Sequence, residues 1–91
     1  MLHLIAYDIA HPKRLRRVAQ ICEDFGVRVE YSVFECDLSR ERFERFWKLL
    51  LQEIDTKNDA LLVYCICAEC LKKSHVAGTA SHAEKQEIYI F

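Results

Sequence analysis

The chain has few of the residues that break regular structure, since its 91 residues include two glycines and one proline. Extensive irregular loops are therefore excluded, because turns draw heavily on these residue types. No apolar run approaches the roughly 20 residues of a membrane-spanning helix. The first residues lack the basic region and cleavage site of an export signal. We therefore expect a cytoplasmic protein with no membrane partner.

An excess of one charge sign is also missing, because 13 basic and 14 acidic residues give a net charge of −1. A uniformly basic nucleic-acid-binding protein is thereby excluded, and such a role requires a local basic patch. The five cysteines are an odd number in a chain without an export signal, so a complete disulfide framework is not expected. A hydrophobic content of 52% indicates one folded domain spanning residues 1–91.

Strand-like runs occur in four parts of the chain. Residues 2–9 and 60–67 are rich in β-branched and aromatic residues, and residues 86–91 form a similar final run. Residues 27–38 alternate between apolar and polar. This alternation fits either one long strand or two short strands with a bend near Ser32.

Apolar residues at helical spacing predict two helices between these strands. The first begins near Pro12 and ends at Gly26, and the second is capped by Ser39. Residues 68–85 are expected to be irregular, with a short strand at 74–77. The order predicts a ferredoxin-like α+β sandwich, βαββαβ with an extra C-terminal strand.

Both faces of the expected sheet carry apolar side chains. In residues 60–67, for example, Leu61 and Val63 alternate with Leu62 and Tyr64. Two helices cover one face, so the other face needs a second cover. A second copy of the chain in a two-fold homodimer supplies it most simply. The alternative is that β-rich strands carry extra apolar residues without a partner.

Asp8 is an acidic residue at the end of an otherwise apolar strand. One carboxylate is a poor Mg²⁺ site, but two copies near a dimer axis form a shared one. A metal there would activate a water and neutralise charge on a phosphodiester. The structural alternative is that Asp8 caps the helix beginning near Pro12 or pairs with an arginine.

A basic cluster lies in the first turns of the first expected helix. It comprises Lys13, Arg14, Arg16 and Arg17. Cations at this end of a helix oppose its dipole, so a polyanion such as a nucleic-acid backbone is a reasonable partner. A solvated helix face is the alternative. Arg28 either extends the patch or pairs with Glu30 or Glu35.

Three cysteines, Cys65, Cys67 and Cys70, lie close together in sequence. The C-x-x-C spacing supplies only two metal ligands, although His75 and His82 could complete a site. A zinc or redox role is therefore weaker than a role as small buried hydrophobes. Cys22 and Cys36 fit core positions, and Phe43, Phe46 and Trp47 lie on one helical stripe that belongs to the core.

Several segments together resemble the CRISPR-associated protein 2 family. They are YDI at 7–9, KRLRRVAQICEDFGVRVEYSVFEC at 13–36 and the cysteine-containing segment at 62–70. The resemblance covers essentially the whole chain. Two positions depart from the family pattern: Glu30 stands where Gln is frequent, and Leu15 where some relatives have Arg.

The resemblance implies a ferredoxin-like homodimer in which the C-terminal strand, about 86–91, packs on the partner subunit. It also implies an endonuclease that uses Mg²⁺ or Mn²⁺ to cut single-stranded RNA or duplex DNA. Asp8 would then be the catalytic and metal-binding residue, facing its copy across the dimer. Tyr7, Ser32 and Phe34 match supporting positions, and Arg17 and Arg28 match basic ones.

The family has a second role that requires no catalysis. Its dimer bridges two dimers of the CRISPR-associated integrase and binds the duplex spacer precursor along a basic surface. The alternative function is therefore a non-catalytic nucleic-acid-binding scaffold. The choice between RNA and DNA stays open at this stage.

Overall fold

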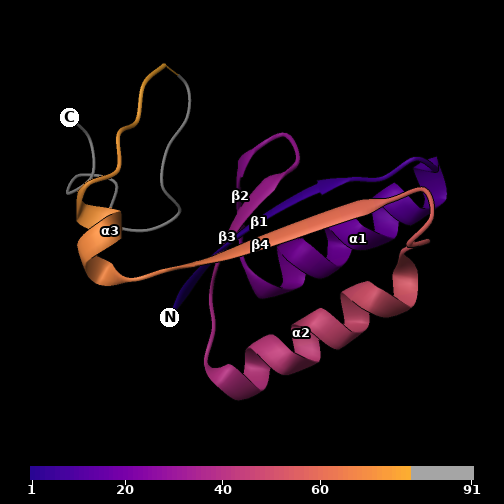
Figure 1. The fold of residues 1–91 in the computed structure, drawn as a ribbon. Coiled ribbons are helices and arrows are strands. Elements are labelled where there is room, and N and C mark those ends of the chain that lie inside the picture. The colour runs from indigo at the N-terminus through magenta and orange to yellow at the C-terminus, as the bar shows by residue number, and fades with distance from the viewer. Residues whose placement is uncertain (79–91) are drawn as a thin grey trace.

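The computed structural model describes residues 1–78, which form a four-stranded antiparallel sheet with two long helices on one face (Figure 1). The elements are β1 (Leu2–Asp8), α1 (Pro12–Phe25), β2 (Val27–Glu30), β3 (Val33–Asp37), α2 (Arg40–Glu53), β4 (Ala60–Ile66) and α3 (Ala68–Lys72). The strand order β2-β3-β1-β4 places β1 between β3 and β4. The predicted ferredoxin-like βαββαβ order is confirmed, and the strand expected at 86–91 lies outside the described residues.

Each long helix begins with a side-chain cap. The Nδ1 atom of His11 accepts a hydrogen bond from the backbone N–H of Lys13 at 3.1 Å, and Pro12 occupies the first helical position. The Oγ atom of Ser39 accepts from the N–H of Arg42 at 3.2 Å, as the sequence predicts. Both caps satisfy a backbone donor that lacks a partner inside the helix.

Gly26 ends α1 for a reason different from the expected one. Its φ of −163° is extended backbone, so no left-handed conformation requires glycine here. A Cβ atom at this position would instead overlap the sulfur of Cys36 and the backbone oxygen of Glu35. The glycine therefore lets the chain pass closely against β3 as it leaves the helix.

The core lies between the two long helices and the sheet. Its fully buried side chains come from β1, β3 and both helices, and they are Ile5, Val18, Cys22, Phe34, Cys36, Phe46 and Leu50. The predicted core positions of Cys22, Cys36 and Phe46 are confirmed. Phe43 and Trp47 are only partly buried, at the edge of this core.

Residues 27–38 form a hairpin rather than one long strand. The strands β2 and β3 are separated by a turn at Tyr31 and Ser32, close to the predicted bend. The backbone N–H of Tyr7 donates to the carbonyl of Ser32 at 3.2 Å. This bond attaches the turn to β1 one residue before Asp8.

The region after β4 differs from the expectation. Residues 68–72 form the short helix α3, and 74–77 contain no strand. Figure 1 shows α3 beyond the end of β4, away from α1 and α2. The expectation of an irregular segment overlooked the residues at 68–72, because alanine, glutamate, leucine and lysine favour a helical turn.

The sheet face turned away from the helices is apolar and exposed. Leu61 and Val63 pack against the core, so Leu62 and Tyr64 point to the opposite face. Leu62 is 51% exposed and Tyr64 is 58% exposed. The predicted second apolar face is therefore present and uncovered in the single chain. No helix in residues 1–78 has the length and apolar character needed to cross a membrane.

Candidate functional site

Asp8 is the last residue of β1 and pairs in register with Ala60 of β4. Its side chain is exposed, and no hydrogen bond or ion pair to its carboxylate occurs within residues 1–78. The cap of α1 is His11, and the nearby Arg14 binds Asp59. Neither structural role considered for Asp8 is therefore found, and its oxygens are available to a ligand.

Arg14 is engaged within the protein. Its Nε donates to Oδ2 of Asp59 at 2.8 Å, and its Nη2 donates to Oδ1 at 3.1 Å. The buried Asp59 carboxylate also accepts from the backbone N–H groups of Ala10 and Asp55. The hydrogen bonds from Arg14 hold the pKa of Asp59 well below its usual range. This pair fixes the start of α1 to the start of β4, immediately beside the Asp8 strand end.

We expect Asp59→Asn to lower the thermal unfolding temperature by several degrees at pH 7. Because the pKa of Asp59 is depressed in the folded state, the carboxylate stabilises the fold above about pH 3.9, the ordinary aspartate pKa. That stabilisation is lost as the pH falls further. Thermal unfolding from pH 7 to pH 2 should therefore show a steeper decline below about pH 4 for the unsubstituted protein than for the variant.

Asp24→Asn is the matched control, because Asp24 is an exposed aspartate that accepts only from Gln20 among the described side chains. It should follow the unsubstituted protein at every pH. Parallel acid profiles for the unsubstituted protein and Asp59→Asn would show that Asp59 contributes no special stability.

A basic hollow of about 360 Å³ lies on the solvent side of α1, lined by Lys13, Arg16, Arg17 and Gln20. Arg17 is 3.7 Å from a carboxylate oxygen of Glu53. Lys13 and Arg16 form no ion pair with a carboxylate in residues 1–78. The first turn of α1 contains no acidic residue. Of the predicted basic cluster, these three cations are accessible to a phosphate, whereas Arg14 is occupied.

Arg28 holds the β2–β3 hairpin together. Its Nη1 donates to the carbonyl of Tyr31 at 2.8 Å, and its Nη2 is 3.2 Å from a carboxylate oxygen of Glu23. Its guanidinium lies 5.0 Å from the centre of the Phe34 ring. The acidic partner seen here, Glu23, is one that the sequence analysis did not consider. A nucleic-acid contact from Arg28 stays a prediction.

The supporting residues Tyr7, Ser32 and Phe34 lie near the Asp8 strand end but not around its carboxylate. Tyr7 and Phe34 are buried on the helix-covered face, with ring centres 6.2 Å apart. Burial raises the pKa of Tyr7, so its hydroxyl stays protonated at neutral pH. Asp8 points to the other face of the sheet because neighbouring side chains alternate. Tyr7 therefore positions the strand rather than a ligand of Asp8.

Cys65, Cys67 and Cys70 are exposed, so the expectation that they are buried hydrophobes is wrong. Cys67 is the N-cap of α3, and Cys70 lies one turn later. The backbone N–H and thiol of Cys70 lower the pKa of Cys67, and the pKa of Cys70 is raised in turn. Within the part of the chain that is described, no three His, Cys, Asp or Glu residues form a metal site. His82 lies outside those residues.

We expect iodoacetamide at pH 8 to alkylate Cys67 several-fold faster than Cys70. The thiolate is the reactive form, and the pKa of Cys67 is the lower of the two. Burial raises the pKa of Cys22 to about 12 and that of Cys36 to about 11, so both should react only after denaturation. Timed labelling and peptide mass spectrometry measure all five rates, with Cys67→Ser as the control. Equal rates at Cys22 and Cys67 would be incompatible with this arrangement.

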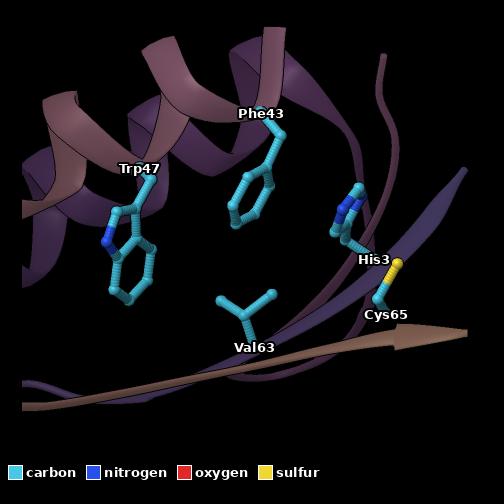
Figure 2. Close-up of a pocket in the computed structure, with 5 residues that line it drawn as sticks. All are labelled: His3, Phe43, Trp47, Val63 and Cys65. Atoms are coloured by element: carbon cyan, nitrogen blue, oxygen red, sulfur yellow. The ribbon is translucent and has the colours of Figure 1, made fainter. Parts of the chain in front are cut away.

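A separate hollow of about 330 Å³ lies between α2 and β4, on the helix-covered face of the sheet (Figure 2). Phe43 and Trp47 point from α2 toward Val63 and Cys65 of β4, with His3 beside them. The His3 and Phe43 rings stack with centres 4.4 Å apart. No Asp, Glu, Lys or Arg side chain lines this hollow, so it offers neither a carboxylate for Mg²⁺ nor a permanent cation for a phosphate.

Sequence reasoning missed two residues near the strand end, Asp59 and Tyr31. Asp59 stood in a polar segment typical of a turn, and nothing local indicated that its carboxylate is buried against Arg14. Tyr31 continued the alternation of a strand, yet it lies in the turn and is 79% exposed. The only sequence feature that could have placed Tyr31 in the turn was its position directly before Ser32, where a bend was expected.

The chain is similar in sequence to proteins of one known family. Residues 1–74 match the family model described as CRISPR associated protein Cas2. A protein of Moorella thermoacetica named CRISPR-associated endoribonuclease Cas2 1 is 51% identical over 69 residues, covering 70% of this chain and 72% of that protein. A protein of Halalkalibacterium halodurans named CRISPR-associated endonuclease Cas2 is 39% identical over 96 residues and covers both chains fully, 100% of each.

The fold is also similar to a solved structure. The crystal structure of Streptococcus pyogenes Cas2 at pH 6.5 superposes with a TM-score of 0.77 and 36% sequence identity. The match covers 86% of this chain and 100% of that chain. Most of this chain therefore shares its fold with a relative of known structure.

Proposed function

The chain belongs to the CRISPR associated protein Cas2 family, and from this we propose that it is a metal-dependent endonuclease of a CRISPR system. The substrate is a phosphodiester in RNA or duplex DNA. The names of the relatives support nuclease activity, since they include both an endoribonuclease and an endonuclease. The observation on this chain that carries the proposal is the exposed Asp8 carboxylate, which has no partner within residues 1–78.

Asp8 fits a magnesium or manganese ion by its chemistry. Carboxylate oxygens are hard ligands, and Mg²⁺ is commonly bound by one or two carboxylates together with water and substrate phosphates. Within residues 1–78, no group of three His, Cys, Asp or Glu side chains could hold the ion by itself. Two copies of Asp8 would therefore hold the ion in a dimer.

The ion and the side chains of the protein have separate roles in the proposed reaction. The bound ion supplies charge neutralisation and an activated water for hydrolysis. Lys13 and Arg16 bind substrate phosphates on the solvent face of α1. Arg14 and Asp59 hold the end of β1 against the start of β4, so that the Asp8 carboxylate keeps its direction.

The active unit is a homodimer formed through the second face of the sheet. Leu62 and Tyr64 expose apolar area there, and Asp8 points to the same face from the neighbouring strand β1. When this face packs against its copy, the apolar area is removed from water. The Asp8 side chains of both subunits then point toward the same interface.

A second candidate function is a scaffold that binds duplex DNA and joins integrase dimers without cleaving. The specific observation in its favour is the basic hollow of α1, where Lys13 and Arg16 have no carboxylate partner among residues 1–78. Reversing charge with Arg16→Glu and Arg17→Glu should abolish spacer acquisition under this reading, whereas Asp8→Asn should leave acquisition intact.

The test of the proposed function is cleavage of labelled single-stranded RNA and of duplex DNA by the purified protein. Product should form with Mg²⁺ or Mn²⁺ and disappear with a chelator. The comparison of the two substrates identifies the class. Cleavage that is insensitive to chelation contradicts the metal-dependent reading.

A further inference from the structure

The turn of the β2–β3 hairpin presents an aromatic ring to solvent. Tyr31 is 79% exposed, more than any other large hydrophobic residue in the described part of the chain. Tyr31 also lines a hollow of about 190 Å³, together with Tyr7, Leu15, Arg16, Ala19 and Arg28. Tyr31 is therefore one wall of a concave site rather than an isolated surface residue.

The lining of this hollow suits one unpaired nucleobase. Leu15 and Ala19 supply an apolar floor, while Arg16 and Arg28 supply donors for base edges or an adjoining phosphate. Aromatic rings stack on any base because each base has a flat π-face. The volume is below the roughly 300 Å³ at which pockets for drug-sized ligands begin, so it matches a single ring system.

The turn is held in place before any ligand binds. Arg28 donates to the carbonyl of Tyr31 at 2.8 Å and is itself fixed by Glu23 and the Phe34 ring. Tyr7 donates its backbone N–H to the carbonyl of Ser32 at 3.2 Å. Because the backbone of the turn is already fixed, binding a base costs little backbone entropy, and only the Tyr31 side chain has to be ordered.

The hollow and Asp8 belong to the same end of β1. Tyr7 lines the hollow, and the next residue, Asp8, points to the other face of the sheet. A flexible single strand can place one base beside Tyr31 and pass around the strand end toward Asp8. A duplex keeps its bases paired and stacked, so it offers none to the hollow.

We propose that Tyr31 is a base-stacking residue that gives this protein a preference for single-stranded nucleic acid. The inference rests on the proposed function only in that nucleic acid binds near Asp8, since it concerns affinity and not cleavage. The preference is for an unpaired base, so single-stranded RNA and single-stranded DNA share it. The phenol hydroxyl is not required, because the ring carries the contact.

Binding of labelled oligouridine, oligothymidine and a blunt duplex tests the proposal by fluorescence anisotropy without divalent metal. Tyr31→Ala should weaken both single strands about 10-fold, within the range known for base–aromatic stacking. Tyr31→Phe should stay within about twofold of the unsubstituted protein, and duplex affinity should not change in either variant.

Three outcomes overturn the inference. They are unchanged single-strand affinity in Tyr31→Ala, an equal loss for duplex and single strand, and absence of single-strand binding by the unsubstituted protein. Light scattering measures the oligomeric state of Tyr31→Ala. A state different from that of the unsubstituted protein would also contradict the inference, because it would assign Tyr31 to a subunit interface. The readout is independent of hydrolysis, so a failure of the nuclease proposal at Asp8 leaves this result interpretable.

Discussion

Asp8→Asn should reduce nucleic-acid cleavage by more than about 100-fold while leaving nucleic-acid affinity within about twofold. The amide has the same shape as the carboxylate but carries no charge, so it is a poor ligand for Mg²⁺. Loss of a metal that contributes several kcal/mol to the transition state accounts for a rate effect of this size. Affinity should persist because Lys13 and Arg16 bind phosphates on another surface.

The substitution is a clean one because the Asp8 side chain makes no contact that stabilises the fold within residues 1–78. Its unfolding temperature should match that of the unsubstituted protein, whereas Asp59→Asn should be destabilised. Initial cleavage rates at saturating Mg²⁺ and anisotropy titrations without metal give the two readouts. Cleavage by Asp8→Asn at the unsubstituted rate would assign the activity elsewhere or to a contaminant.

The periodicity of the chain predicted the fold well because local chemistry agrees with the tertiary packing. Runs of β-branched and aromatic residues predicted β1 and β4, and Ser39 marked the start of α2, where its Oγ accepts a hydrogen bond from the N–H of Arg42. The hairpin at Tyr31 stayed undecided, since a strand and a hairpin share the same alternation and differ only at the turn. The bond between Tyr7 and Ser32 that fixes it joins residues far apart in sequence.

The candidate site was predictable in part. Asp8 was identified by an acidic side chain at the end of an apolar strand, which is visible in the sequence alone. The division of the basic cluster was not visible, because it depends on Asp59 reaching Arg14 from 45 residues away. Long-range pairs of this kind leave no periodic pattern, so the sequence assigned Arg14 and Arg16 to the same nucleic-acid-binding cluster.

In the homodimer proposed above, Tyr64→Asp should disrupt the interface, leave a monomer and thereby reduce cleavage by more than about 100-fold. Tyr64 lies on the apolar face opposite the helices, across from Leu4 of β1. A carboxylate at the centre of a dimer interface is costly to desolvate, and two copies related by symmetry also repel each other. Several kcal/mol of lost association weaken a dimer more than 100-fold.

Leu51→Asp provides the matched control, because Leu51 is 45% exposed on α2, a helix on the other face of the sheet. It adds the same charge and should leave both dimerisation and cleavage unchanged. Light scattering across micromolar concentrations measures the dimer, and circular dichroism checks that Tyr64→Asp keeps its helices. A folded Tyr64→Asp monomer that cleaves at the unsubstituted rate would mean that one Asp8 suffices. The symmetric pairing of carboxylates on this face would then have no part in catalysis.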